Sequence, residues 1–113
     1  MSIFMTKPWL TSTGHELAEV PVQTGVYEIA DADGTVIDIG FAGATEPFGL
    51  RSKITTLVSE YGIEGVQFRY EINVQYMSRY TELVLAHRSR SGELPPKVAE
   101  RGEEFHGRLA IDN

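Results

Sequence analysis

An aspartate lies in the middle of an apolar, strand-like run, where that residue type is unusual. Asp38 stands between Ile37 and Ile39, and aspartate is disfavoured in β-strands. One interpretation is a solvent-facing residue of an alternating strand, which accepts a hydrogen bond from Tyr27 or from a helix amide. The other is a functional carboxylate, which can accept a proton or bind a hard metal ion. The residues alone leave both interpretations open.

Basic side chains are concentrated in the second half of the chain. Lys7 is the only lysine or arginine in residues 1–50, which hold seven acids, whereas residues 51–101 hold eight bases and six acids. A polyanion should meet this second half, because phosphate contacts need Lys and Arg. Such basic patches are usually solvated faces, but they are also where a phosphate backbone would bind. The patch consists of Arg88, Arg90, Lys97 and Arg101.

The composition restricts the class of protein. The chain has 113 residues and a net charge of −6, which fits one acidic domain. It contains no cysteine, so disulfides and Cys-ligated zinc are excluded. His15, His87 and His106 have no ligand spacing, and we treat them as structural or surface residues. With neither a signal-like start nor an apolar run of about 20 residues, we expect a cytoplasmic protein without a membrane span.

The residues around Tyr27 and Asp38 predict a β-hairpin. Residues 25–30 and 35–41 are strand-like, and the Asp33-Gly34 pair between them supplies the positive φ angles of a tight turn. The pairing could centre on residues 32–33 or on residues 33–34. In either register Tyr27 and Asp38 share one face of the sheet, directly opposite in the first case and diagonal in the second.

Two further candidate side chains, Arg51 and Glu82, lie in segments with helical periodicity. Apolar residues at helical spacing predict one helix over residues 48–61 and another over residues 77–90. Arg51 lies at the edge of the first helix's stripe, and Glu82 lies away from the second's. Both positions also fit ordinary exposed side chains.

The order of elements predicts an α+β fold. Strict alternation predicts a third strand over residues 66–74, and the order is then β-β-α-β-α. We expect a small mixed sheet with an N-terminal hairpin, covered by helices. Residues 24–96 would form the domain. An arm of residues 1–23 with a short helix from about 14 to 19 would precede it, and a tail of residues 97–113, helical over 97–105, would follow.

Four motifs have a spacing typical of one enzyme family. Gly25-Val26-Tyr27 is followed, ten residues later, by Asp38-Ile39-Gly40 on the paired strand. Arg51 follows on the first helix, and Glu82 lies on a later one. Together with the stretch of residues 87–96, this pattern resembles the GIY-YIG nuclease superfamily over roughly residues 24–96.

The resemblance implies hydrolysis of a nucleic-acid phosphodiester with one divalent metal ion, Mg²⁺ or Mn²⁺. Glu82 would bind the metal and Arg51 would stabilise charge on the phosphate. The tyrosine of the second motif, helped by Tyr27, would activate the attacking water. The chemistry is consistent with the residue types, since Mg²⁺ prefers hard oxygen ligands and a guanidinium fits two phosphate oxygens.

The second motif departs from the family pattern. Asp38 replaces its tyrosine, and Phe41 stands where many members carry a lysine. An aspartate could act as a weak base, with an ordinary pKa of about 4, or add a second carboxylate to the metal ion. Without a metal between them it would repel a phosphate. The departure therefore indicates changed metal use or lost activity.

Two main functions follow from the resemblance. The first is a degenerate metal-dependent endonuclease with Tyr27, Asp38 and Arg51 as catalytic residues. Its Mg²⁺ or Mn²⁺ would be bound by Glu82 and Asp38.

The second function is an inactive module of the same fold that binds a protein partner or nucleic acid. A protein could contact Phe41, Pro47 and Phe48, which lie close to the inherited site. Nucleic acid would use Arg51, Arg88, Arg90 and Lys97. A plain homodimer held by exposed sheet surface is a third, weaker alternative.

Overall fold

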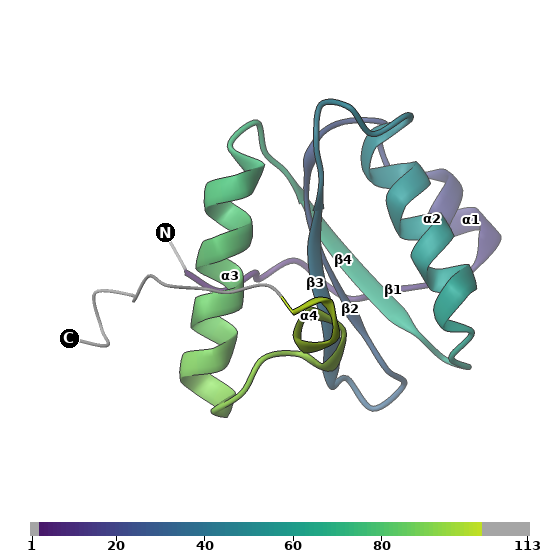
Figure 1. Cartoon of the computed structure of the whole chain (residues 1–113). Helices are drawn as coiled ribbons and strands as arrows, with labels where there is room; N and C mark the ends of the chain where they lie inside the picture. The colour runs from purple at the N-terminus through teal and green to yellow at the C-terminus, as the bar shows by residue number, and fades with distance from the viewer. Residues whose placement is uncertain (1–2, 103–113) are drawn as a thin grey trace.

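The protein is an antiparallel sheet with helices on both faces, seen in a computed structural model that describes residues 3–102 (Figure 1). Its strands are β1 (Leu10–Thr11), β2 (Gly25–Ala30), β3 (Val36–Ala42) and β4 (Gln67–Ile72). Its helices are α1 (Gly14–Ala18), α2 (Gly49–Tyr61), α3 (Tyr76–Ser91) and α4 (Pro96–Arg101). The predicted α+β class and the β-β-α-β-α order are confirmed, with β1 and α1 preceding the hairpin.

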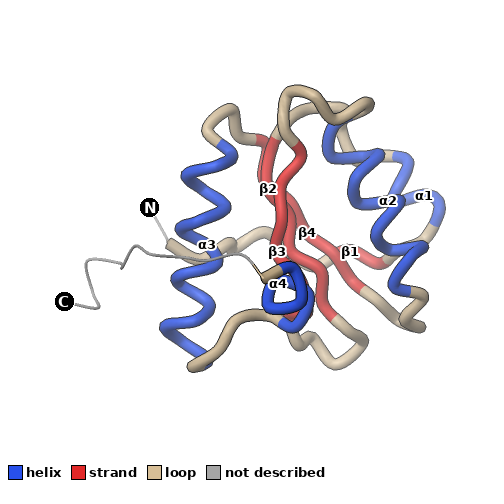
Figure 2. Tube along the Cα trace, viewed as in Figure 1, coloured by secondary structure: helices blue, strands red, loops and turns tan. Residues whose placement is uncertain are grey.

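The sheet has the strand order β1-β4-β2-β3 and is antiparallel at every described pairing, where we expected a mixed sheet. The difference comes from the placing of β4. The connection through α2 returns the chain parallel to β3, but β4 pairs with β2 instead of β3. The two parallel strands are therefore separated by β2, which is antiparallel to both. This order leaves β3 at one edge of the sheet (Figure 2).

The predicted hairpin is present in the second of its two registers. Tyr27 pairs with Gly40 and Ile29 pairs with Asp38, so Tyr27 and Asp38 are diagonal neighbours on one face. A bulge after Ile29 shifts the last pair of the ladder. The turn is stabilised by Asp31, whose Oδ1 accepts from the amides of Asp33 and Thr35 at 2.9 and 3.0 Å.

Two apolar layers fix the helices on opposite faces of the sheet. On one face Tyr27, Ile29 and Phe68 pack with Leu50 and Ile54 of α2. Val26 of β2 and Ile39 of β3, whose side chains point to the other face, pack with α3 and α4. Their partners there are Leu83, Val84 and Val98. The alternation of side chains along each strand decides which helix a residue meets.

The helices end close to their predicted limits. Gly62 and Gly92 follow α2 and α3 in the left-handed conformation that glycine adopts readily. The helix predicted over residues 97–105 begins one residue earlier, at Pro96, and is observed to Arg101. Residues 103–105 of that prediction lie outside the described part of the chain.

The N-terminal arm is packed against the domain from Ile3 onward. Met5 is buried among the α3-side residues, and Leu10 pairs with Phe68 at the start of β1. The guanidinium of Arg69 lies 4.1 Å from the centroid of the Trp9 ring. Contacts with β4 and α3 therefore hold the predicted arm against the domain.

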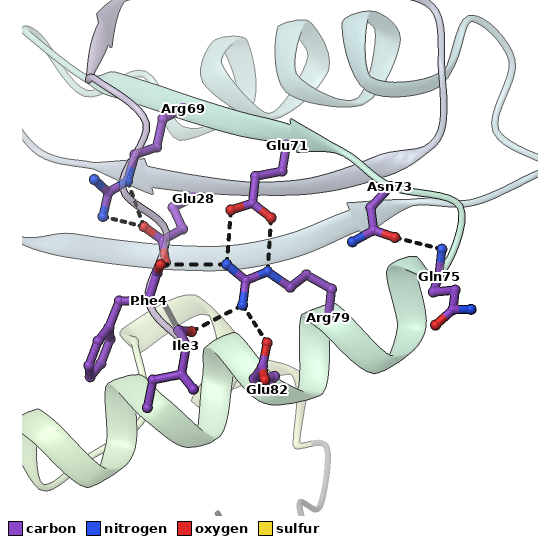
Figure 3. Close-up of polar contacts among 9 residues, drawn as sticks. All are labelled: Ile3, Phe4, Glu28, Arg69, Glu71, Asn73, Gln75, Arg79 and Glu82. Atoms are coloured by element: carbon purple, nitrogen blue, oxygen red, sulfur yellow. Dashed lines mark hydrogen bonds and ion pairs between the residues drawn. The ribbon is translucent and has the colours of Figure 1, made fainter. Parts of the chain in front are cut away.

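Arg79 joins this arm, β4 and α3 through all five of its guanidinium N–H groups (Figure 3). Two bonds of 2.8 and 2.9 Å go to the carboxylate of Glu71, and one goes to Glu82. The carbonyls of Ile3 and Phe4 accept the other two. The same guanidinium therefore satisfies polar groups from three segments distant in the sequence.

A second ion pair lies beside Arg79 on the same face. Glu28 Oε1 is 2.7 Å from a guanidinium nitrogen of Arg69, and both side chains are largely buried. Burial raises the pKa of Glu28, and the neighbouring Arg69 opposes that shift without cancelling it.

We expect the Arg79→Met variant to lose about 3 kcal/mol of unfolding free energy, because it leaves the largely buried carboxylate of Glu71, 19% exposed, without its partner. Urea denaturation measures the loss. Glu82→Gln is the matched control, since this side chain is 39% exposed and exposed pairs contribute roughly 1 kcal/mol or less. Equal losses in the two variants would contradict a structural role for the guanidinium.

Candidate functional site

A hollow of about 680 Å³ runs along the outer edge of β3. Its walls come from β3 and the loop after it, from α2 on one face of the sheet, and from α3 and α4. Five aromatic side chains line it: Tyr27, Phe41, Tyr61, Tyr76 and Tyr80. The charged side chains on its walls are Lys53, Lys97, Arg101, Glu46, Glu60 and Glu100. We call this hollow the β3 pocket.

Asp38 is sealed behind the wall of the β3 pocket. Its side chain has 0% exposure, and both carboxylate oxygens accept hydrogen bonds. The Tyr61 hydroxyl donates to Oδ2 at 2.6 Å, and the Arg101 guanidinium donates to Oδ1 at 3.0 Å. Arg101 also donates to the carbonyl of Ile39 at 2.9 Å. The solvent-facing interpretation of Asp38 is therefore wrong, and the donors to its carboxylate are Tyr61 and Arg101 instead of the expected Tyr27 or helix amide.

Tyr27 lies next to Asp38, as the hairpin predicted, and is also almost completely buried. Its ring crosses Gly40, where a Cβ atom would come within 2.1 Å of the Tyr27 hydroxyl oxygen. Glycine at position 40 is thus required by the tyrosine on the paired strand. Burial and then the charge of Asp38 raise the pKa of Tyr27 well above its usual value. The phenol therefore stays protonated at neutral pH and cannot act as a base.

Tyr61 has the same protonation state for a related reason. Burial, followed by its hydrogen bond to Asp38, raises the pKa of this phenol above its usual value of about 10. The phenols of Tyr27 and Tyr61 are therefore both protonated at neutral pH, and Tyr61 donates its proton to Asp38.

Arg51 does not reach the β3 pocket. Its Nε donates to the carbonyl of Val20 at 2.7 Å, and the residue is exposed beside the segment that leads into β2. Lys53, Leu57 and Tyr61 of the same helix do line the pocket. Because successive helical residues are about 100° apart, Lys53 points roughly 200° away from Arg51. The helix therefore presents a lysine, not the predicted arginine, to the site.

Glu82 lies on the other face of the sheet. Its carboxylate pairs with Arg79, which is bonded to Glu71 of β4 (Figure 3). Asp38 instead shares the α2 face with Ile29, its cross-strand partner. The structure therefore brings Tyr27 and Asp38 together, but it leaves Arg51 and Glu82 elsewhere.

These positions do not fit a metal ion shared by Asp38 and Glu82. The first carboxylate has both oxygens occupied and no solvent contact, and the second is held by an arginine on the opposite face. Across residues 3–102 there is no group of three or more His, Cys, Asp or Glu side chains arranged to hold a metal ion.

The predicted basic patch divides between two places. Lys97 and Arg101 line the β3 pocket. Arg90 instead lies with its guanidinium 3.5 Å from the Phe4 ring centroid, against the N-terminal arm. The sequence predicted Arg101 only as part of this patch and did not single out Tyr61, whereas both side chains bind Asp38. The signal was Asp38 itself, since a carboxylate among isoleucines needs donors if it is buried.

The charges around the β3 pocket nearly balance. Lys53, Lys97 and Arg101 are matched by three lining glutamates, and the buried Asp38 adds one further acid. The local sum is one excess negative charge. With its aromatic walls, such a pocket is poorly suited to a polyanion and better suited to neutral, aromatic or cationic groups.

Comparison with protein families places residues 3–90 in a family described as a domain of unknown function, DUF7508. Comparison with curated proteins gave no match, and comparison with solved structures gave none. Within residues 3–102, no helix is both long and apolar enough to cross a membrane.

We expect Arg101→Met to lose about 3 kcal/mol of unfolding free energy, because Asp38 then keeps a buried charge with a single donor. Adding Asp38→Asn removes that charge and should recover part of the loss. Urea denaturation of the wild type, the two single variants and the double variant measures the coupling. Strictly additive losses would contradict the Asp38–Arg101 interaction.

Proposed function

The chain belongs to the DUF7508 family of domains of unknown function, and we propose that it is a catalytically inactive, GIY-YIG-like module that binds a protein partner in the cytoplasm. The observation that carries the proposal is the burial of Asp38. This residue occupies the position of the second-motif tyrosine, to which the resemblance assigns the activation of water. A carboxylate with 0% exposure and two bound donors cannot meet a water molecule or a metal ion.

The other residues of the resemblance support the same conclusion. Tyr27 is a protonated, buried phenol packed across Gly40. Arg51 is bonded to a backbone carbonyl outside the β3 pocket. Glu82 neutralises Arg79 on the opposite face. Phosphodiester cleavage would require these three groups and Asp38 around one phosphate. Each of them instead has separate protein partners.

Exposed apolar side chains support a protein as the partner. Among the described residues, the large apolar side chains that are exposed all belong to segments next to the start of β2 or the ends of β3 and β4. They are Val22, Phe48, Ile72, Val74 and Met77. These strand ends lie at the top of Figure 1. Met77 also lines the β3 pocket. A cluster of this kind is typical of an interaction surface, and the negative net charge of the chain disfavours nucleic acid.

We call these five residues the apolar end, and Phe48 is the most informative of them. It is 72% exposed and has φ 60°, and no other non-glycine residue among those described has a positive φ. The left-handed conformation costs an L-residue about 1–2 kcal/mol. A bulky side chain at this position is therefore unfavourable for the folded chain alone. An exposed aromatic side chain at this strained position supports a role as an anchor for a partner.

We expect the purified protein to leave plasmid DNA and single-stranded RNA intact in the presence of Mg²⁺ or Mn²⁺, because Asp38 has no access to water or metal. Agarose and denaturing gel electrophoresis provide the measurement. Metal-dependent cleavage that disappears in both Tyr27→Phe and Glu82→Ala would contradict the proposal. Cleavage that is equal in the wild type and both variants would identify a contaminating nuclease.

We expect Phe48→Asn to raise the unfolding free energy by about 0.5–1 kcal/mol, because asparagine tolerates the left-handed conformation better. Thermal and urea unfolding measure the change. Val74→Asn is the matched control: this residue is also exposed, at 82%, but it has no positive φ. Equal effects in the two variants would show that backbone strain at position 48 is not the cause.

A further inference from the structure

The walls of the β3 pocket carry aromatic faces from both layers of helices. The Phe41 ring is stacked on Tyr76 with centroids 5.5 Å apart, and Tyr80 meets Phe41 edge-on at 5.1 Å. Tyr61 comes from α2, which covers the other face of the sheet. The electron-rich faces of such rings attract cations.

One aromatic face of the pocket already holds an ammonium group of the chain itself. The Nζ of Lys97 lies 4.8 Å from the centroid of the Tyr61 ring. The same nitrogen is 3.7 Å from a carboxylate oxygen of Glu100. A ring face and a carboxylate are thus arranged to hold a positive charge. Because the Lys97 side chain is partly exposed, an incoming cation can displace it.

The charge balance points to the same kind of ligand. Glu46, Glu60 and Glu100 offset the three bases on the walls, and Asp38 behind them leaves one negative charge in excess. The whole chain carries −6. Coulomb attraction therefore favours a cation over an anion, both at long range and inside the pocket.

We infer that the β3 pocket binds a basic side chain, arginine or lysine, presented by a protein partner; this inference rests on the proposed function. The cation lies against the Tyr61 face and is neutralised by Glu60 and Glu100, with Lys97 displaced. A volume of about 680 Å³ exceeds one side chain and accommodates the flanking residues of a short segment. The apolar end around Phe48 and Met77 adjoins the pocket and contacts the rest of the partner.

Replacing Lys97 gives a test, because the loss of its positive charge should strengthen the binding of a cation and weaken the binding of an anion. The probe is N-acetylarginine amide, followed by chemical-shift mapping of amide resonances in the full chain. We expect binding with a dissociation constant on the order of millimolar, and shifts concentrated at residues 40–46 and 97–101. Lys97→Met should tighten binding about threefold, because it removes the competing ammonium from the Tyr61 face. Glu60→Gln should weaken binding by a similar factor.

Lys7→Met is the matched control for the change in net charge. Lys7 is exposed, lies outside the β3 pocket, and its replacement removes the same charge as Lys97→Met. This variant should bind the probe with affinity close to that of the wild type. A threefold gain in Lys7→Met as well would show that the effect comes from overall charge, and would overturn the site.

Two further outcomes would also overturn the inference. One is the absence of any shift with N-acetylarginine amide in both the wild type and Lys97→Met. The other is binding of adenosine monophosphate in the pocket that is weakened by Lys97→Met, which would identify an anion site. Neither outcome affects the proposal of an inactive module, which is overturned independently by metal-dependent nuclease activity.

Discussion

The carboxylate of Asp38 is the constraint on which the β3 pocket depends. It has no solvent contact, so its hydrogen-bond acceptors must be satisfied within the protein. Tyr61 from α2 and Arg101 from α4 supply the donors, and Arg101 also bonds the carbonyl of Ile39. One buried acid therefore holds a helix from each of two regions against β3. The same Arg101 covers the carbonyl of Ile39 on this edge strand, which would otherwise be free to pair with another chain.

A second charged cluster organises the opposite face and separates the residues of the nuclease resemblance. Arg79 binds Glu71, Glu82 and the carbonyls of the N-terminal arm, and thereby fixes the arm beneath α3. The carboxylate of Glu82 is paired with Arg79 and so has a structural role. Because the sheet lies between the two clusters, Asp38 and Glu82 cannot act on the same ligand. The two clusters explain why the four residues of the resemblance do not form a common site.

The surface beside the pocket has features that stability alone does not require. Exposed apolar residues belong to segments next to one end of the sheet, and Phe48 is held there in a conformation that costs free energy. The adjoining pocket has aromatic walls and one excess acid. Apolar area next to a cation-accepting pocket is the combination that a protein segment with a basic anchor would fill.

The sequence by itself determined the features that depend on neighbouring residues. The strand-like runs and the Asp33-Gly34 turn predicted a hairpin with Tyr27 and Asp38 on one face, and helical spacing predicted the limits of α2 and α3 to within one residue. Tertiary structure decided the partners of each charge. Tyr61 and Arg101 lie 23 and 63 residues from Asp38, and no local period encodes such distances. Motif spacing could not reveal that Arg51 and Glu82 point away from the pocket, because helix rotation and the choice of sheet face are set by packing.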